Sequence, residues 1–167
     1  MADRRITKVK LTKTKVHIEY EVLHEKAGEP DAFTVICGDK PTLAFEAALR
    51  ELVCDVTNIC DFPVEDARVI TVRSVSCTYQ KKILGAVVTA LKSLKHSNAP
   101  LVLNTPHLPE MPYSGEDTDP NPTMPAGMAD RLRALLAEAA CYIDGDRLQG
   151  RLFGVTEPEP ETVGAEA

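Results

Sequence analysis

Lysine and arginine side chains gather in two parts of the sequence, and together they could bind phosphate groups. The first sixteen residues contain six basic residues and one acidic residue, so this segment carries a net charge of +5. Basic side chains neutralise phosphates and release counterions, which gives salt-dependent binding that tolerates different base sequences. The residues predicted to contact a nucleic acid are Lys8, Lys10, Lys13, Lys15, Arg73, Lys81, Lys82 and Lys92, with Tyr79 as a ring on which a base could stack.

Other features of the composition weigh against this interpretation. The chain of 167 residues has a net charge of −6, and many of its acidic residues lie in 106–130 and after residue 156. Aromatic residues make up 5% of the chain and Trp is absent, which is little for a protein that stacks bases. Glu19 and Glu21 would share a strand face with the lysines and repel phosphate. A charged, solvated sheet face that deters edge-to-edge aggregation is therefore the alternative.

A short apolar motif lies close to the end of the chain. Gln149, Leu152 and Phe153 form the pattern Q-x-x-L-F, and a Pro- and Glu-rich stretch follows it. The adjacent Leu and Phe could anchor the peptide in an apolar pocket, with the Gln bonding at its rim. The pentapeptide resembles the motif by which bacterial replication and repair proteins bind the sliding clamp, which implies a clamp as partner. The alternative is that these side chains tether the end of the chain to its body.

No group of residues predicts catalysis. The nine Gly residues are scattered, so no phosphate-cradling loop is expected, and neither G-x-S-x-G nor H-E-x-x-H occurs. The four His residues have no ligand spacing with the five Cys residues, and no C-x-x-C occurs. We therefore predict no catalytic residue, no metal and no cofactor. The odd Cys count, with no secretory segment and no long apolar run, indicates a reduced cytoplasmic protein outside the membrane.

Alternation of apolar and polar residues predicts strands in the first part of the chain. The pattern runs through 5–22, which indicates a β-hairpin, and through 33–37, which indicates a third strand. Pro41 and Thr42 then open a helix that runs to about residue 59, where apolar residues recur at helical spacing. β-branched residues predict another strand over 68–79.

The segment 83–104 allows two interpretations. Its β-branched residues Val87, Val88 and Thr89 favour a strand, followed by a turn at 97–100 and a short strand at 101–103, whereas its apolar spacing also fits a helix over 83–96. We predict the hairpin and leave the helix open. Residues 105–127 contain six prolines, so they predict a long irregular loop that is functional or disordered. A second amphipathic helix follows over 128–143.

These elements, in the order β-β-β-α-β-β-β-α, predict one α+β domain over residues 1–146 and a flexible tail over 147–167. The sheet would be largely antiparallel, with about five to six strands and two helices packed on one face. The opposite face would carry the basic residues. An exposed sheet edge would allow a homo-oligomer without requiring one.

A basic, β-rich body followed by a flexible acidic end resembles the single-stranded-DNA-binding proteins of bacteria and their viruses. In those proteins the tail recruits partners and competes with DNA for the basic face. The chain departs from them because it ends in Val163–Ala167 rather than in a short acidic and apolar tip, and because it lacks a five-stranded OB pattern. The runs 97–107 and 147–153 also resemble small uncharacterised proteins of bacteriophages and prophages, which implies a bacterial cytoplasm.

We therefore predict a non-enzymatic accessory protein of phage DNA replication or recombination. Its sheet would bind single-stranded DNA, and its residues Gln149, Leu152 and Phe153 would dock on the host sliding clamp. One alternative is a protein-interaction or inhibitory module without DNA affinity that acts on a host factor. Another is a small-molecule binder or hydrolase whose pocket is closed by the loop 105–127. The residues do not distinguish DNA from RNA.

Overall fold

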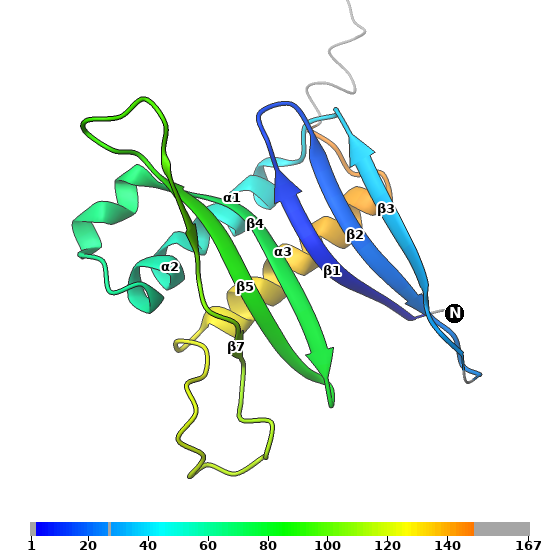
Figure 1. Cartoon of the computed structure of the whole chain (residues 1–167). Coiled ribbons are helices and arrows are strands. Elements are labelled where there is room, and N and C mark those ends of the chain that lie inside the picture. The colour runs from blue at the N-terminus through cyan, green and yellow to red at the C-terminus, as the bar shows by residue number, and fades with distance from the viewer. Residues whose placement is uncertain (1–2, 27, 149–167) are drawn as a thin grey trace, which may run out of the picture.

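An antiparallel sheet forms the body of the protein in the computed structural model, which describes residues 3–26 and 28–148 (Figure 1). Six strands lie side by side in the order β3-β2-β1-β4-β5-β6, and the short strand β7 pairs with β5. The strands are β1 (Asp3–Leu11), β2 (Val16–Leu23), β3 (Asp31–Cys37), β4 (Ile70–Gln80), β5 (Ile83–Lys92), β6 (Leu101–Asn104) and β7 (Leu108–Pro109). The predicted α+β class with a largely antiparallel sheet is confirmed.

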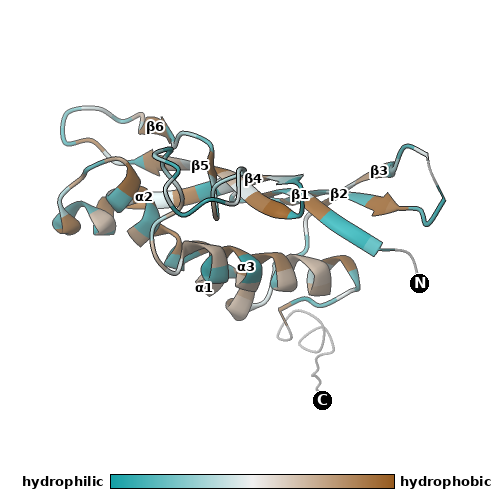
Figure 2. Cartoon of the chain, turned by 90° about the horizontal axis from the view of Figure 1, so that it is seen from below, coloured by the Kyte–Doolittle hydropathy of each residue, from teal (hydrophilic) through white to brown (hydrophobic). Residues whose placement is uncertain are grey.

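Helices cover one face of this sheet, and Figure 2 shows α1 and α3 lying beneath it. The helices are α1 (Leu43–Glu51), α2 (Val53–Ile59) and α3 (Met128–Ile143), and a 3₁₀ helix, η1 (Val64–Val69), leads into β4. The single helix expected after Pro41 is interrupted at Leu52, whose amide donates to the carbonyl of Leu49 at 3.2 Å in a tight turn. Beyond this turn, buried Asp55 meets Arg131 of α3, whose Nε donates to Oδ2 at 2.8 Å. The described helix layer thus has three α-helices rather than two.

A short polar turn joins β1 to β2 and fixes their register. The amide of Thr12 donates to the carbonyl of Lys15 at 2.9 Å, and the amide of Lys15 donates to the hydroxyl of Thr12 at 3.0 Å. This register places Lys10 opposite His17 and Leu11 opposite Val16. Because side chains alternate along a strand, the apolar members of the hairpin face the helices and the polar members face away.

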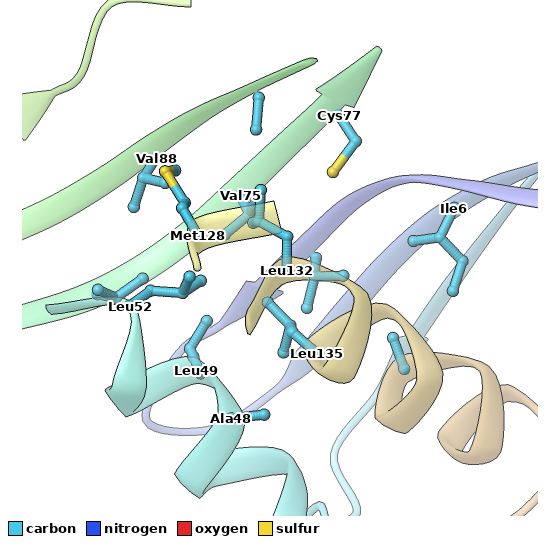
Figure 3. Packing of buried hydrophobic residues seen from close by; sticks show 14 of the residues in the cluster. Ile6, Ala48, Leu49, Leu52, Val75, Cys77, Val88, Met128, Leu132 and Leu135 are labelled. Carbon is cyan, nitrogen blue, oxygen red and sulfur yellow. The ribbon is translucent and has the colours of Figure 1, made fainter. Parts of the chain in front are cut away.

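The core lies between the sheet and the helices (Figure 3). Val75 and Val88 come from neighbouring strands, and their side chains are fully buried. They belong to one cluster with Leu52, Leu132 and Leu135, which are also fully buried. Burial of apolar surface contributes about 25 cal/mol per Å², so this cluster is what keeps the helices on one face of the sheet.

Residues 83–92 form a strand, so the hairpin prediction for this segment is confirmed and the helical alternative is wrong. Gly85 is buried in β5 opposite Pro109 of β7, and a Cβ atom there would lie 2.5 Å from Nε2 of His107. Further along, β5 pairs with β6, with Thr89 opposite Asn104. A glycine is thus required at position 85 by a close approach between two segments of the sheet.

The Pro-rich segment 105–127 is partly fixed against the sheet, rather than irregular throughout. It contributes β7, and the amide of Met124 donates to the carbonyl of Pro109 at 2.9 Å. The carboxylate of Glu110 accepts a hydrogen bond from the amide of Leu84 at 2.9 Å and forms an ion pair with Arg133 at 2.7 Å. These contacts hold both ends of the segment close to β5 and α3.

Helix α3, with 16 residues, is the longest helix in the described part of the chain. Among residues 3–26 and 28–148, no helix has the length and apolar character needed to cross a membrane.

All five cysteines are free thiols, and Cys77 is the most enclosed because it points into the core.

Candidate nucleic-acid interface

The face of the sheet opposite the helices, called the open face below, carries two of the predicted lysines. Lys8 and Lys10 alternate with buried Val9, so they point away from the helices. On the β4 side their neighbours are exposed Ser76 and buried Ser74. The open face is therefore lined by ammonium and hydroxyl groups where β1 meets β4.

Carboxylates balance the charge on the other side of β1. Glu19 lies opposite Lys8 in the β1–β2 register, and its Oε2 lies 2.8 Å from Nε2 of His17. Arg5 pairs with Glu21 at 3.2 Å. The repulsion of phosphate expected from these two glutamates thus applies to β2, whereas β4 presents uncharged hydroxyls.

Four basic side chains gather at the end of the sheet where β1 turns into β2. Lys13 and Lys15 are exposed in that turn, and Lys10 precedes it on the open face. Arg73, at a bulge near the start of β4, donates from Nη1 to the carbonyl of Leu11 at 3.1 Å. We call Lys10, Lys13, Lys15 and Arg73 the turn-end basic cluster. Among the described residues, none of the four forms an ion pair with a carboxylate.

A hollow of about 220 Å³ adjoins this cluster. Lys13 and Lys15 line it together with Lys40, which lies between β3 and α1, and with the carboxylates of Asp39 and Glu46. The last described residue, Leu148, donates its amide to the carbonyl of Lys40 at 3.1 Å. The described part of the chain therefore ends beside the turn-end basic cluster.

Two predicted contact residues lie on the helix side of the sheet and not on the open face. Lys92 lies opposite buried Ile70, and its Nζ is 3.3 Å from Asp66 and 4.9 Å from the ring centre of Phe62. It lies on that face because strand alternation from the core residue Ala90 places it there. The assignment of Lys92 to a phosphate-binding face is therefore corrected.

Tyr79 is likewise unable to act as a stacking platform. Its hydroxyl donates to the carbonyl of Ile6 at 2.6 Å, and the guanidinium of Arg5 lies 5.5 Å from its ring centre. Burial raises the pKa of this hydroxyl above its ordinary value. The ring alternates in phase with Cys77 of the core, so it packs against the helix side and is not presented to a base.

Lys81 and Lys82 form the turn between β4 and β5, at the other end of the sheet from the turn-end basic cluster. Both are exposed and both have positive φ angles, 52° and 63°. Lys81 follows Arg73 by eight residue steps along the strand, which is roughly 26 Å at 3.3 Å per residue. The predicted basic residues thus make two clusters joined by a hydroxyl-lined strand, rather than one continuous patch.

The sequence-based prediction of contact residues did not include the residues of the open face that lie between these clusters. Ser76 and Thr78 alternate along β4, and the hydroxyl of Thr78 lies 2.8 Å from Nε2 of His107. Thr89 of β5 donates to Asn104 of β6 at 2.7 Å. The signal was available in the sequence for Ser76 and Thr78, because they alternate with Val75, Cys77 and Tyr79.

A larger hollow, of about 660 Å³, lies on the helix side of the sheet and not beside the open face. Its apolar lining includes Leu49, Val53 and Ile70, and the exposed arginines Arg50 and Arg68 also line it. None of its lining residues comes from 105–127, where the sequence placed the lid of a pocket. Within the described residues, no three His, Cys, Asp or Glu side chains could hold a metal ion together.

Gln149, Leu152 and Phe153 lie outside the described residues, so the structure gives no account of the clamp-like motif. Comparisons of the chain with protein-family models, curated proteins and solved structures found no match. The geometry of the open face and the motif itself are therefore the features that bear on function.

Proposed function

We propose that the protein is an accessory factor of phage-type DNA replication or recombination in a bacterial cytoplasm, and that it binds single-stranded DNA through its open face. The observation that carries this proposal is the turn-end basic cluster. Its four cations have no carboxylate partner among the described residues and lie at one end of a hydroxyl-lined strand face. Lys, Arg, Ser and Thr side chains are the usual donors to phosphate oxygens.

The proposed binding is electrostatic rather than based on stacking. Tyr79 is held against Ile6, so the ring that the sequence offered for a base is occupied. Each phosphate neutralised on a single strand contributes about −0.7 to the slope of log Kobs against log salt concentration. Four contacts from the turn-end basic cluster therefore give a slope of about −2.8.

Fluorescence anisotropy of a labelled oligo-dT strand, at low and at moderate salt, tests this proposal. Changing Lys13→Glu together with Lys15→Glu reverses two charges of the cluster and should weaken binding at low salt by more than tenfold. The matched control is Arg50→Glu with Arg68→Glu, which makes the same change in net charge on exposed residues of the helix side. Equal loss in both variants would mean that only the net charge matters, and the open-face proposal would fail.

We also propose that Gln149, Leu152 and Phe153 dock the protein on the bacterial sliding clamp. The pattern Q-x-x-L-F supports this, as does the departure of the chain beside Lys40 at the edge of the body. Changing Leu152→Ala with Phe153→Ala should abolish binding to purified clamp in surface plasmon resonance and leave DNA binding unchanged. Clamp binding that survives both changes would contradict the proposal.

A second candidate is a protein-interaction module without DNA affinity, and the hollow of about 660 Å³ favours it. Its apolar lining and the two exposed arginines would suit a segment of a host protein with apolar and acidic residues. The two candidates are separated by the same anisotropy titration. An absence of DNA binding at the lowest salt would favour the interaction module.

A further inference from the structure

Strand β3 ends the sheet, and its outer edge has no strand partner among the described residues (Figure 1). Both of its faces carry exposed apolar side chains. Phe33, which faces the helix side, is 45% exposed, and Ile36, which faces the open side, is 57% exposed. A free row of backbone amides and carbonyls beside exposed apolar side chains is a template for pairing with another strand.

The two edges of the sheet differ in how well they are protected. At the far edge, β6 has four residues, Pro106 follows it, and β7 ends in Pro109, so little regular backbone is offered to a new strand. By contrast, β3 has seven residues, and none of them is Lys, Arg or Pro. Its register with β2 runs without a bulge from Cys37 to Asp31. The features that normally block edge pairing are therefore present at one edge and missing at the other.

We propose that β3 pairs with β3 of a second copy of this chain, antiparallel and about a two-fold axis at Thr34. This register uses all seven residues of the strand. It places Thr34 opposite itself, Phe33 opposite Val35 on the helix side, and Ala32 opposite Ile36 on the open side. Each apolar residue therefore meets an apolar residue on its own face, which is the self-complementarity that a two-fold interface requires.

The charges at the ends of the strand fit the same register. Asp31 of one copy lies opposite Cys37 of the other, and Nη2 of Arg147 is 3.9 Å from the sulfur of Cys37. Within its own chain Asp31 contacts the exposed ring of His24 at 3.0 Å, and its side chain is 62% exposed. The two-fold axis therefore brings an acidic side chain of each copy toward an arginine of the other.

The pairing would have a consequence for the open face, which depends on the proposed function. The two-fold axis stands perpendicular to the sheet, so both helix layers remain on one side. The two open faces then form one continuous surface of twice the width. A single-stranded nucleic acid could contact both turn-end basic clusters of the dimer.

Sedimentation equilibrium of the full chain without DNA tests the pairing independently of DNA binding. The wild type should sediment with twice the mass of the chain in the micromolar range. Ile36→Lys should raise the dimer dissociation constant by roughly tenfold or more, because a lysine on an edge strand blocks continued pairing. The matched control is Val102→Lys on β6, since Val102 is also 57% exposed, and this variant should remain dimeric. A monomeric wild type, or equal loss in both variants, would overturn the proposal, and circular dichroism would confirm that each variant is folded.

A cysteine at the two-fold axis tests the register. Residues directly opposite each other on antiparallel strands have Cβ atoms about 4.5–5.5 Å apart, which is close enough for a disulfide after small adjustment. Thr34→Cys should therefore form a covalent dimer under mild oxidation, whereas Ala32→Cys should not exceed the wild-type level, because residue 32 lies opposite residue 36. Equal cross-linking of the two variants would exclude this register.

Two other outcomes would also contradict pairing through β3. A dimer that resists Ile36→Lys would place the interface on another surface. Binding of a foreign peptide by a monomeric wild type would identify a different partner for the edge.

Discussion

Among the described glycines, Gly85 is the one at which an added Cβ atom would approach its neighbours most closely. A Cβ atom at this position would lie 2.5 Å from Nε2 of His107 and 2.7 Å from Oγ1 of Thr78. Gly85→Ala should therefore lower the free energy of unfolding by about 1–3 kcal/mol, as overpacking usually does. Urea denaturation measures this change.

Two further variants separate this contact from a general effect of losing a glycine. Gly38→Ala is the control, because the nearest atom to a Cβ there is 3.7 Å away, and it should change stability by less than about 0.5 kcal/mol. Gly85→Ala should cost less stability in a His107→Ala background than in the wild type, because the ring of His107 is then absent. A Gly85→Ala protein as stable as the wild type would show that the strands can separate without cost.

Cys37 and Cys60 are both half-buried thiols, but their surroundings shift the pKa in opposite directions. Hydrogen bonding from the Tyr142 hydroxyl, the Asp39 amide and Arg147 lowers the pKa of Cys37, whereas burial and then Asp61 raise that of Cys60. A lower pKa means more thiolate near pH 8, so Cys37 should be alkylated by iodoacetamide faster than Cys60.

Peptide mass spectrometry over a pH series measures both alkylation rates in one sample. The rate at Cys37 should reach its plateau at a lower pH than the rate at Cys60. Tyr142→Phe should shift the Cys37 profile to higher pH. Both rates are measured in the Ile36→Lys variant, so that pairing of the β3 edges does not limit access of iodoacetamide to Cys37. Indistinguishable pH profiles for the two thiols would contradict the prediction.

Among the elements, the turn between β4 and β5 has a geometry that its residues do not favour. Lys81 and Lys82 both have positive φ angles in a two-residue hairpin turn, for which Asn-Gly is preferred. Lys81→Asn with Lys82→Gly should stabilise the protein by about 1 kcal/mol and raise Tm by about 2–4 °C. Differential scanning calorimetry measures the shift.

The same double variant removes the second basic cluster of the open face. If Lys81 and Lys82 contact phosphate, oligo-dT affinity should fall at low salt while Tm rises. Such opposite changes cannot come from a loss of folding. Unchanged affinity would confine the contacts to the turn-end basic cluster, and a lower Tm would contradict the argument from turn geometry.

The elements that could be predicted from the sequence are those with a strong local pattern. The alternation in 5–22 identified the hairpin of β1 and β2, and the β-branched run in 83–92 identified β5 correctly against a helical alternative. The interruption at Leu52 left no local signal, because the apolar stripe of the helix continues through it. The interruption becomes understandable only in the folded structure, where Asp55 of α2 meets Arg131 of α3.

At the scale of the whole molecule, strand order decides which predicted site residues meet. Lys8, Lys10, Lys13, Lys15 and Arg73 come together because β4 pairs with β1 across 58 residues of intervening chain, from Leu11 to Ile70. The sequence could assign each lysine to a strand, but it could not show that Lys81 and Lys82 lie at the opposite end. Lys92 and Tyr79 were misassigned although the pattern of their own strands places them on the helix side: Lys92 alternates in phase with buried Ala90, and Tyr79 alternates in phase with buried Cys77.

The proposed dimer and the proposed DNA site together predict a dependence on the length of the nucleic acid. A short oligo-dT that covers one open face uses one turn-end basic cluster, so its affinity should be the same for the wild type and for Ile36→Lys. A strand long enough to reach both copies binds the second cluster at a high effective concentration, and its affinity for the wild type should exceed that for Ile36→Lys by at least tenfold. Anisotropy titrations with a series of oligo-dT lengths measure both, and Val102→Lys serves as the control for an added lysine. If Ile36→Lys weakens short and long strands equally, the edge of β3 contributes to DNA binding directly and not through pairing of the two sheets.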